Sequence, residues 1–441
     1  MKDSGVAWLG SIPAGWTVVG ARRLFALRSQ RATADDAQLT ASQAYGVIPQ
    51  DEFVAREGRR VVQVIKDPSI LKHVEPGDFV ISMRSFQGGI ERSDDRGSVS
   101  SAYVVLRPLP AVHARYFTYL LKCKSYIQAL QSTSDLVRDG QALRYDNFAL
   151  VRLPLVPLVE QKTIADYLDS ETARIDALID RKQRFVDLLL EKRTTVITHA
   201  VTRGLDPSVE MKDSAVVCLG MVPAHWAVAP LRRVITWMEQ GWSPQCDNRP
   251  AEESEWSVVK AGIVNGGVFH HDERKGLPAH LEPQPRYELH PGDLLVSRAN
   301  GSLQYIGSAG VVPTDVRSRT LLCDKVFRMH LDRDAAVPEF IAAALQSGPV
   351  RYQIQRDATG TSTMRNVGQD TLRALVVGLP TVGEQREIIE SIRQQHAEIG
   401  VLVDKTRTSI DLLREYRTAL ISAAVTGQID IPGTETSEDV A

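Results

Sequence analysis

Cysteine is scarce in this chain, and the cysteines that are present stand far apart. The 441 residues include only Cys123, Cys218, Cys246 and Cys323, and no two of them form a C-x-x-C pair. This spacing argues against a disulfide framework and against a structural zinc site. Reduced thiols in a cytoplasmic protein are the simpler interpretation.

Long apolar runs and a dominant sign of charge are missing as well. No stretch approaches about 18 uninterrupted apolar residues, so we expect no membrane span, and the N-terminus lacks the pattern of a signal peptide. The net charge is −2. Residues 1–150 carry 19 Lys and Arg against 15 Asp and Glu, whereas residues 211–380 carry 18 of each. This distribution permits nucleic-acid binding without demanding it.

Motifs of catalysis are also missing. The sequence has no G-x-x-x-x-G-K-[ST] nucleotide loop. It also has no Asn/Asp-Pro-Pro-aromatic stretch of the kind with which amino-methyltransferases grip a flipped base. His270 and His271 are the first candidates for a pair of metal ligands. The side chains of adjacent residues point apart, however, and no further histidine follows at helical spacing. We therefore expect a polar loop there.

The chain contains an internal repeat. Residues 1–16, MKDSGVAWLGSIPAGW, are repeated at residues 211–226 as MKDSAVVCLGMVPAHW, and ten of the sixteen positions are identical. PGDFVIS (76–82) returns as PGDLLVS (291–297), and Glu160-Gln161 returns as Glu384-Gln385. LLLEKRTTVITHAVT (188–202) returns as LLREYRTALISAAVT (412–426). Units of about 210 residues are too long for a solenoid and indicate a duplicated module.

Each copy consists of a variable body followed by a long charged helix. Short β-branched runs separated by turns, with a few short amphipathic stretches, predict mixed α/β bodies. We predict an α+β protein with two such domains and a pair of long helices. The expected boundaries are 1–155 and 206–380 for the bodies, 156–205 and 381–430 for the helical regions, and 431–441 for a flexible acidic tail.

Apolar residues in both helical regions recur in steps of three, four and seven, a spacing that predicts the heptad repeat of a coiled coil. A helix this long with one apolar stripe needs a partner that covers the stripe along its length. The second helical region of the same chain can provide that partner. We expect an antiparallel coiled coil and a pseudo-twofold axis between the copies; two unrelated surface helices are the alternative. The residues expected to pair the helices are Ile164, Leu168, Ile175, Leu178, Leu189, Ile388, Ile392, Ile399, Leu402 and Leu413.

These motifs carry a resemblance to a known family. The sequence resembles the specificity subunit of type I restriction–modification systems, the HsdS family. The motifs that carry the resemblance are WLGSIPAGW, YGVIPQ, PGDFVISM, VSSAYVVLRP, LPLVPLVEQKTIADYLD and LLxExRTxxIxxAVT, the last of which occurs twice. The resemblance covers nearly the whole chain before the acidic tail, and the motifs occur in the expected order.

The resemblance implies two target-recognition domains that each read one half of a bipartite sequence in double-stranded DNA. It implies that the subunit performs no chemistry itself and binds two modification subunits, which methylate adenine at N6 with S-adenosylmethionine. Restriction subunits would join to form an ATP-dependent nuclease. S-adenosylmethionine and ATP are thus expected on the partner subunits only, and no cofactor or metal on this chain.

Candidate DNA-reading residues follow from the types of side chain that bond base edges and phosphates. Arg bonds guanine, Asn and Gln bond adenine, and Ser, Thr and Lys hold phosphates. The segment after each PGD strand is polar and differs between the copies, as does a second polar segment before each body's last strand; ordinary solvated loops are the alternative. The candidates are Ser82, Arg84, Ser85, Gln87, Arg138, Gln141 and Arg144 in the first body, and Ser297, Arg298, Asn300, Ser302, Gln304, Thr361, Thr363 and Arg365 in the second.

Two further sets recur in both copies. Arg22-Arg23 and Arg232-Arg233 occupy equivalent positions, which favours a shared structural role or phosphate contact over sequence reading. Ile197, Val201, Ile421 and Val425 near the helix ends are candidates for docking the modification subunits, with packing on the chain's own bodies as the alternative. Two other functions stay open at this point: an enzyme with unrecognised motifs, and a scaffold that pairs two proteins and ignores DNA.

Overall fold

The computed structural model describes residues 1–58, 70–133, 143–246, 249–252, 254–360 and 365–433. The chain divides into two compact units. Unit 1 comprises Met1–Gln183 and Thr408–Ala441, and unit 2 comprises Arg184–Arg407. Each unit therefore contains one body together with parts of both long helices, α6 (Leu158–Arg203) and α10 (Val382–Val425).

The body of unit 1 is built on a four-stranded antiparallel sheet with strand order β4-β11-β8-β9. The strands are β4 (Phe25–Leu27), β11 (Val104–Pro108), β8 (Phe79–Ile81) and β9 (Glu91–Arg92). One face packs on α3 (Ala114–Leu120), α4 (Lys124–Gln131) and α5 (Tyr145–Leu150), where the rings of Phe79, Phe117 and Phe148 stand edge-on to Phe25. Side chains alternate along each strand, so Val80 and Val105 point to the other face.

That other face carries a smaller layer of strands. It consists of β5 (Leu39–Ser42), β6 (Gly46–Pro49), β7 (Lys72–Val74) and β10 (Gly97–Val99), with α1 (Gln50–Glu57) after β6. Leu39, Val47, Val74 and Val99 from these strands bury Val80 and Val105. The body is therefore a sheet between a helical layer and a second β-layer.

The body of unit 2 repeats this sheet with the order β16-β23-β19-β21. The strands are β16 (Ile235–Gln240), β23 (Val326–Leu331), β19 (Leu294–Ser297) and β21 (Ala309–Val311), covered by α7 (Pro338–Gln346), α8 (Gly348–Asp357) and α9 (Gln369–Ala374). The outer layer differs: β17 (Ser257–Val259) pairs antiparallel with β18 (Arg274–Gly276) and parallel with β22 (Thr320–Leu321). The common framework is thus duplicated, while the outer layers have diverged.

The repeated opening motif folds in the same way in both units. It forms a two-stranded ladder, β1 (Lys2–Asp3) with β2 (Ser11–Ile12) and β13 (Met211–Asp213) with β14 (Met221–Pro223). A second ladder joins β3 (Thr17–Gly20) to β12 (Arg152–Leu155) and β15 (Ala227–Pro230) to β26 (Val376–Leu379). The strands β12 and β26 lead directly into the long helices. The second ladder therefore pairs an early strand of each body with the strand that precedes its long helix.

The repeated Glu-Gln pair at the start of each long helix has a matching role in both units. The Gln161 amide accepts a hydrogen bond from His113 N at 2.7 Å and donates to the carbonyls of Ala111 and Val156. Gln385 makes the equivalent bonds to Val337, Ala335 and Pro380. Both glutamines are fully buried. Their amides therefore satisfy backbone groups where the helical layer meets the long helix.

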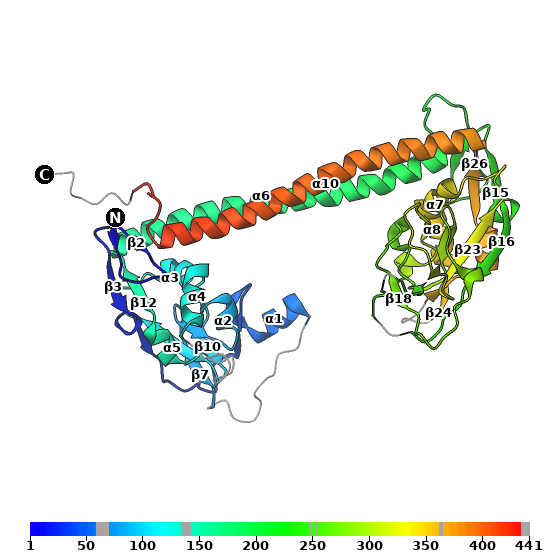
Figure 1. Ribbon diagram of the computed structural model, residues 1–441. Helices are drawn as coiled ribbons and strands as arrows, with labels where there is room; N and C mark the ends of the chain where they lie inside the picture. Colours follow the sequence, from blue (N-terminus) through cyan, green and yellow to red (C-terminus); the bar gives the residue numbers. More distant parts are fainter. Residues whose placement is uncertain (59–69, 134–142, 247–248, 253, 361–364, 434–441) are drawn as a thin grey trace. The chain divides into compact units, whose positions relative to one another are not determined.

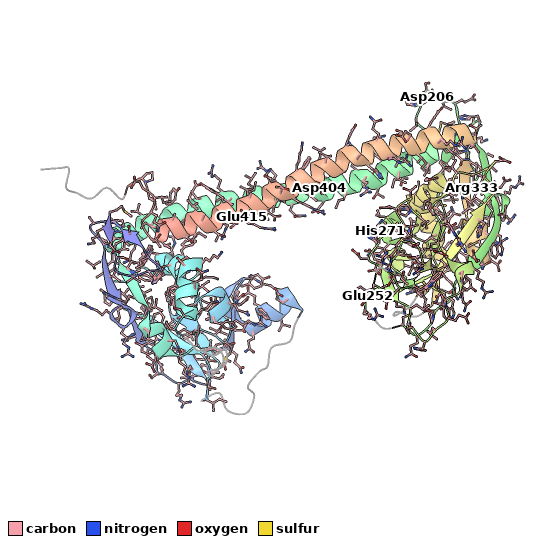
Figure 2. All side chains as sticks on the ribbon, in the orientation of Figure 1. Asp206, Glu252, His271, Arg333, Asp404 and Glu415 are labelled. Atoms are coloured by element: carbon pink, nitrogen blue, oxygen red, sulfur yellow. The ribbon has the colours of Figure 1, made fainter. Side chains whose placement is uncertain are left out.

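Within each unit the two long helices run antiparallel side by side (Figure 1). In unit 1, Arg417 of α10 pairs with Asp176 of α6 at 2.9 Å. In unit 2, Arg193 Nε donates to His396 Nδ1 at 3.2 Å, and Val186, Leu189, Ile399 and Val403 form a buried seam. Polar side chains such as Asp404 and Glu415 stand out from α10 (Figure 2).

The expected seam residues divide into two groups. Ile164, Leu168, Ile175, Leu189, Ile388, Ile392 and Ile399 are buried, and Leu413 is partly buried against the core of unit 1. Leu178 and Leu402 are instead 39% and 45% exposed, and the neighbouring Val403 takes the buried position. An α-helix turns by 3.6 residues rather than 3.5, so which of two adjacent apolar residues faces the partner depends on the packing.

The chain stays packed beyond α10. Gly427 follows the helix with a φ of +70°, a conformation that suits glycine. A Cβ at this position would lie 2.4 Å from Pro13. Ile431 is buried in the core of unit 1, so the part of the expected tail that the structure describes begins as packed chain rather than as a flexible one.

Candidate nucleic-acid interface

The first set of candidate DNA-reading residues lies at the end of β8. Ser82 and Ser85 are 9% and 1% exposed, and Ser85 Oγ accepts a hydrogen bond from Ser82 N at 2.8 Å. These two serines hold the turn into the short helix α2 (Ser85–Gly88). Arg84 and Gln87 are exposed. Arg84 and Gln87 are therefore the most exposed of this set, while Ser82 lines the hollow beside Arg84.

Arg84 lines a hollow of about 410 Å³ beside the β5–β6 hairpin. Gln43, Phe53, Met83 and Tyr103 also line it. Gln43 Nε2 donates to the carbonyl of Arg84 at 3.2 Å, and burial raises the pKa of Tyr103, so its hydroxyl stays protonated. The lining also includes Glu57, whose carboxylate accepts a hydrogen bond from the Tyr45 hydroxyl. The cation, amide and aromatic groups of the hollow are those that contact nucleic acids. Gln43 and Tyr103 carried no sequence signal, because the chain brings them to Arg84 from other strands.

The equivalent segment of unit 2 follows β19. Ser297 is fully buried, and Arg298 is half-buried with its guanidinium donating to the Asp324 carbonyl at 3.2 Å over the Phe327 ring. Ser302 is half-buried and Gln304 is exposed. Arg351 of α8 donates to the carbonyls of Leu303, Gln304 and Ile306 and so fixes the backbone there.

A three-stranded ladder joins the two candidate sets of unit 2. Strand β20 (Ala299–Asn300) pairs with β25 (Arg365–Asn366), which also pairs with β24 (Thr359–Gly360). Asn300 lies directly opposite Arg365. Residues directly opposite in an antiparallel ladder share a face. Two segments that are 65 positions apart in the sequence thus form one polar surface.

The second candidate set of unit 1 is described only in part. Arg138 and Gln141 lie outside the described residues, as do Thr361 and Thr363 of unit 2. Arg144 is exposed at the start of α5, where its backbone N–H donates to Asn147 Oδ1 at 3.0 Å. Gln131, at the end of α4, donates to the Phe86 carbonyl of α2. This contact places the end of α4 beside the Arg84 segment.

The paired arginines that recur in both units lie on short 3-10 helices, Ala21–Arg23 and Leu231–Arg233. Arg22 pairs with Asp146 at 3.1 Å, and both side chains are largely exposed. Arg23, Arg232 and Arg233 are exposed as well. Their positions on the repeated framework agree with a role common to both units.

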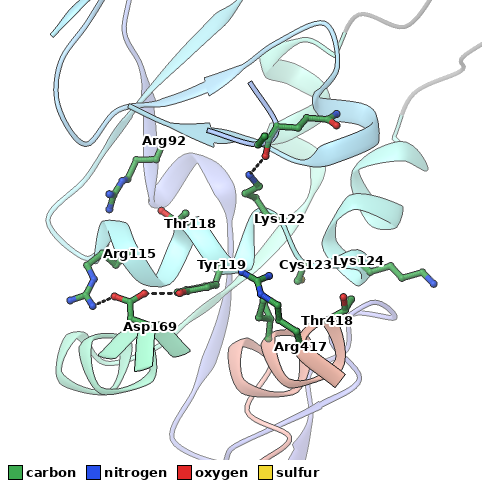
Figure 3. A pocket seen from close by; sticks show the side chains of 13 residues that line it. Arg92, Arg115, Thr118, Tyr119, Lys122, Cys123, Lys124, Asp169, Arg417 and Thr418 are labelled. Atoms are coloured by element: carbon green, nitrogen blue, oxygen red, sulfur yellow. Dashed lines mark hydrogen bonds and ion pairs between the residues drawn. The ribbon is translucent and has the colours of Figure 1, made fainter. Parts of the chain in front are cut away.

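A cavity of about 540 Å³ lies between α3, α4 and the long helices of unit 1 (Figure 3). Its lining includes Arg92, Arg115, Lys122 and Arg417, each of which pairs with a carboxylate. Arg115 contacts both Asp166 and Asp169, and Tyr119 donates to Asp169 at 2.6 Å. These ion pairs neutralise four of the cations, and the exposed Lys124 also lines the cavity, which lies at the junction of body and helices.

The helix-end residues proposed for partner docking pack on the chain's own bodies. Val201 and Val425 are 3% and 0% exposed, in the cores of unit 2 and unit 1 respectively. Ile197 and Ile421 are partly buried against the same cores. Tyr116 of α3 also donates to the Val425 carbonyl at 2.8 Å. Val201 and Val425 are therefore core residues that hold the bodies on the helices, while Ile197 and Ile421 are only partly covered by those bodies.

Other apolar residues of the helices remain exposed. Leu188 and Leu412, which occupy equivalent positions of the repeat, are 62% and 60% exposed. In unit 1, Leu178, Leu413 and Tyr416 line a groove of about 350 Å³ flanked by Arg174 and Arg181. The heptad pattern did not predict this surface, because it placed Leu178 and Leu413 in the pairing between the two helices.

The two adjacent histidines make separate contacts. His270 Nε2 donates to the Asn265 carbonyl at 2.9 Å, and His271 lies on the surface of unit 2, 3.7 Å from Asp315 (Figure 2). In the part of the chain that the structure describes, no three His, Cys, Asp or Glu residues are grouped to hold a metal ion. Within the same residues, no helix combines the length and apolarity that crossing a bilayer requires.

No family model matches the chain, but curated relatives do. It is 24% identical over 365 residues to the specificity subunit of the type I restriction enzyme EcoKI of Escherichia coli K12, covering 81% of this chain and 75% of that protein. It is 31% identical over 206 residues to the EcoEI specificity subunit of Escherichia coli, covering 46% of this chain and 34% of that protein. The chain is a homologue of type I specificity subunits.

Solved structures of type I systems share the fold. The HsdS subunit of Thermoanaerobacter tengcongensis matches with a TM-score of 0.55 at 15% identity, over 95% of this chain and 98% of that one. A chain from a structure of type I R-M complex assembly matches with a TM-score of 0.69 at 15% identity, over 95% and 100%. These matches agree with the expected α+β fold of a type I specificity subunit, including its two long helices.

Proposed function

We propose that this chain is the DNA-specificity subunit of a type I restriction–modification complex and that each unit reads one half of a bipartite target. The observation that carries the proposal is the duplicated sheet with divergent outer layers. A shared framework with different surfaces suits two half-sites of different sequence. The polar surfaces at Arg84 in unit 1 and at Asn300 and Arg365 in unit 2 are the corresponding reading surfaces.

The exposed leucines of the long helices support a second part of the proposal. Leu412 in unit 1 and Leu188 in unit 2 occupy equivalent positions and are about equally exposed. A modification subunit that lays an amphipathic helix on such a surface would bury them. Two equivalent surfaces fit two modification subunits per chain, and restriction subunits would join that complex.

The chain contributes recognition and assembly in this proposal, and its partners contribute catalysis. Adenine-N6 methylation with S-adenosylmethionine belongs to the modification subunits and ATP-driven cleavage to the restriction subunits. A cytoplasmic location accords with the four cysteines, none of which forms a disulfide.

The decisive experiment detects methylated adenines by long-read sequencing in a methylation-free host that produces this chain with its modification subunit. The proposal expects methylation at one bipartite motif and none when either protein is left out. Methylation by this chain alone, or methylation without a sequence motif, would contradict it. Binding of the purified complex to DNA should also weaken steeply with salt, because phosphate contacts release counterions.

A further inference from the structure

We infer that Asn300, held in place by Asn265, reads an A·T base pair in the half-site recognised by unit 2. This inference rests on the proposed function and adds to it a chemical identity for one recognised position. It also assigns a positioning role to Asn265, which lies 35 residues before Asn300.

The Asn300 amide has a fixed orientation. Its Nδ2 donates to Asn265 Oδ1 at 3.1 Å, and its Oδ1 accepts from the backbone N–H of Ser302 at 3.2 Å. A backbone N–H can only donate, so the side-chain atom that it meets must be the oxygen. A flip of the amide would turn Nδ2 toward the Ser302 N–H, so the Ser302 bond fixes the orientation of Asn300.

These two bonds leave half of the amide's capacity unused. A side-chain amide has two N–H donors and two acceptor lone pairs. Asn300 uses one of each inside the protein and keeps one of each free. Adenine presents an acceptor, N7, and a donor, the N6 amine, side by side in the major groove, whereas guanine presents two acceptors there. One free donor and one free acceptor match adenine and mismatch guanine.

Asn265 is itself held rigidly. It begins a turn in which Gly266 and Gly267 have φ values of +63° and +80°. His270 donates to the Asn265 carbonyl at 2.9 Å. A Cβ at Gly267 would collide with the side chain of Gln346 at the end of α7. The turn thus packs closely against α7, so Asn300 is held by this turn of the body as well as by Ser302 of its own loop.

The surroundings of the amide pair allow a close approach of DNA. Asn265 and Asn300 are half-buried, while Gly266, Gly301 and Gly360 nearby in the chain or ladder are exposed. Residues without a side chain let a duplex come near the backbone. Arg365, directly opposite Asn300, can bond a neighbouring phosphate or guanine from the same face.

The first test replaces Asn300 by Asp in the complete complex with its modification subunits and maps methylated adenines. Asn300→Asp keeps the shape but removes every donor of the amide. One A·T position of one half-site should lose its preference by about 10- to 100-fold, the discrimination of a bidentate contact. The other half-site should not change. Gln355→Glu, an exposed amide on α8, introduces the same charge in unit 2 and should leave the whole motif unchanged.

The second test separates positioning from general stability. Asn265→Leu removes the acceptor and should relax the same A·T position. Asn265→Asp keeps the acceptor and should restore the preference, a rescue that a purely structural role does not predict. Selectivity is compared between bases at one position, so a uniform loss of affinity does not affect the comparison.

The outcomes distinguish this inference from the proposed function. A wild-type bipartite motif that keeps every A·T preference in Asn300→Asp and in Asn265→Leu overturns the inference and leaves the function intact. Relaxation at a G·C position overturns it equally. Absence of any sequence-restricted methylation with the wild-type chain overturns the proposed function, and the inference with it.

Discussion

The indole Nε1 of Trp16 donates a 2.7 Å hydrogen bond to Glu160 Oε2 in the first turn of α6. The repeat reproduces this bond between Trp226 and Glu384 at 2.9 Å. Both indoles are at least 98% buried. A buried N–H needs an acceptor, and a carboxylate is also favoured near a helix N-terminus. This relationship explains why the opening motif and the Glu-Gln pair recur together.

Glu160→Ala should destabilise unit 1, because it leaves the buried indole N–H of Trp16 without an acceptor. The expected loss is about 1–3 kcal/mol of the free energy of unfolding. Glu160→Gln keeps an acceptor oxygen and should lose less. Urea unfolding followed by tryptophan fluorescence measures both variants. Equal stability of Glu160→Ala and the wild type would show that water replaces the carboxylate.

Asp78→Ala should destabilise unit 1 more strongly. Arg28 bonds both carboxylate oxygens of Asp78, at 2.5 and 3.0 Å, and Asp78 Oδ2 also accepts from the Glu75 backbone. The two side chains are 16% and 1% exposed. Removing one partner of such a pair costs about 3–5 kcal/mol.

The matched control for Asp78→Ala is Arg22→Ala, which breaks the exposed pair of Arg22 with Asp146. That change should cost less than about 1 kcal/mol. Thermal unfolding compares the two variants. A similar effect of both would refute the importance of burial at Asp78.

The stability of unit 1 should fall as pH rises above about 6.5. His73 is fully buried, and its ring nitrogens lie 2.8 Å from Asp36 and 2.8 Å from Glu75, so both carboxylates favour the protonated ring. Burial opposes that charge, but the hydrogen bonds and charges of Glu75 and Asp36 outweigh it and raise the pKa of His73 above its ordinary 6.5. The guanidinium of Arg96 also lies 3.6 Å from Asp36.

The sign of this effect follows from proton linkage. A raised pKa of His73 stabilises the folded state below pH 6.5, and the stabilisation is lost as pH passes through the folded value. Burial lowers the pKa of His113 below its ordinary 6.5. The contribution of His113 to the pH dependence of stability therefore falls below pH 6.5, outside the range in which His73 acts. Unfolding free energies between about pH 6 and 8.5 should decline in the wild type and stay level in His73→Asn. An equal slope in both would assign the effect elsewhere.

Leu412→Lys should reduce the number of modification subunits per chain from two to one, because a charge on one exposed apolar surface weakens one docking site. Leu188→Lys should do the same through the equivalent surface of unit 2. Native mass spectrometry of the co-purified complex measures the stoichiometry. Both leucines are at least 60% exposed, so circular dichroism and thermal unfolding should match the wild type. Two retained subunits in both variants would place docking elsewhere.

The repeat allowed much of the framework to be predicted. Trp16 and Trp226 donate to equivalent glutamates, because the repeated indole brings its repeated acceptor with it. Asp78 and Asp293 accept the equivalent backbone N–H of the turn, but they pair with the non-equivalent arginines Arg28 and Arg328. Long helices with an apolar stripe likewise imply a helical partner. The exposure of Leu178 and Leu402 was not predictable, because adjacent apolar residues compete for one buried position.

The reading surfaces were predicted less well, for a related reason. Sequence analysis selects residue types, but Ser297 and Arg365 are both polar, and only the fold buries the first and pairs the second with Asn300. Asn265, Gln43 and Tyr103 gave no signal, since their importance arises from contacts with distant segments.

The sequence by itself determined that the chain is a duplicated module, that each copy ends in a long helix, and that the copies differ where they should read DNA. These features are local or periodic, so the order of the residues along the chain is enough to recognise them. Only the tertiary structure decided which polar side chains are free and which apolar residues are buried. Both depend on groups that packing brings together across many residues of sequence.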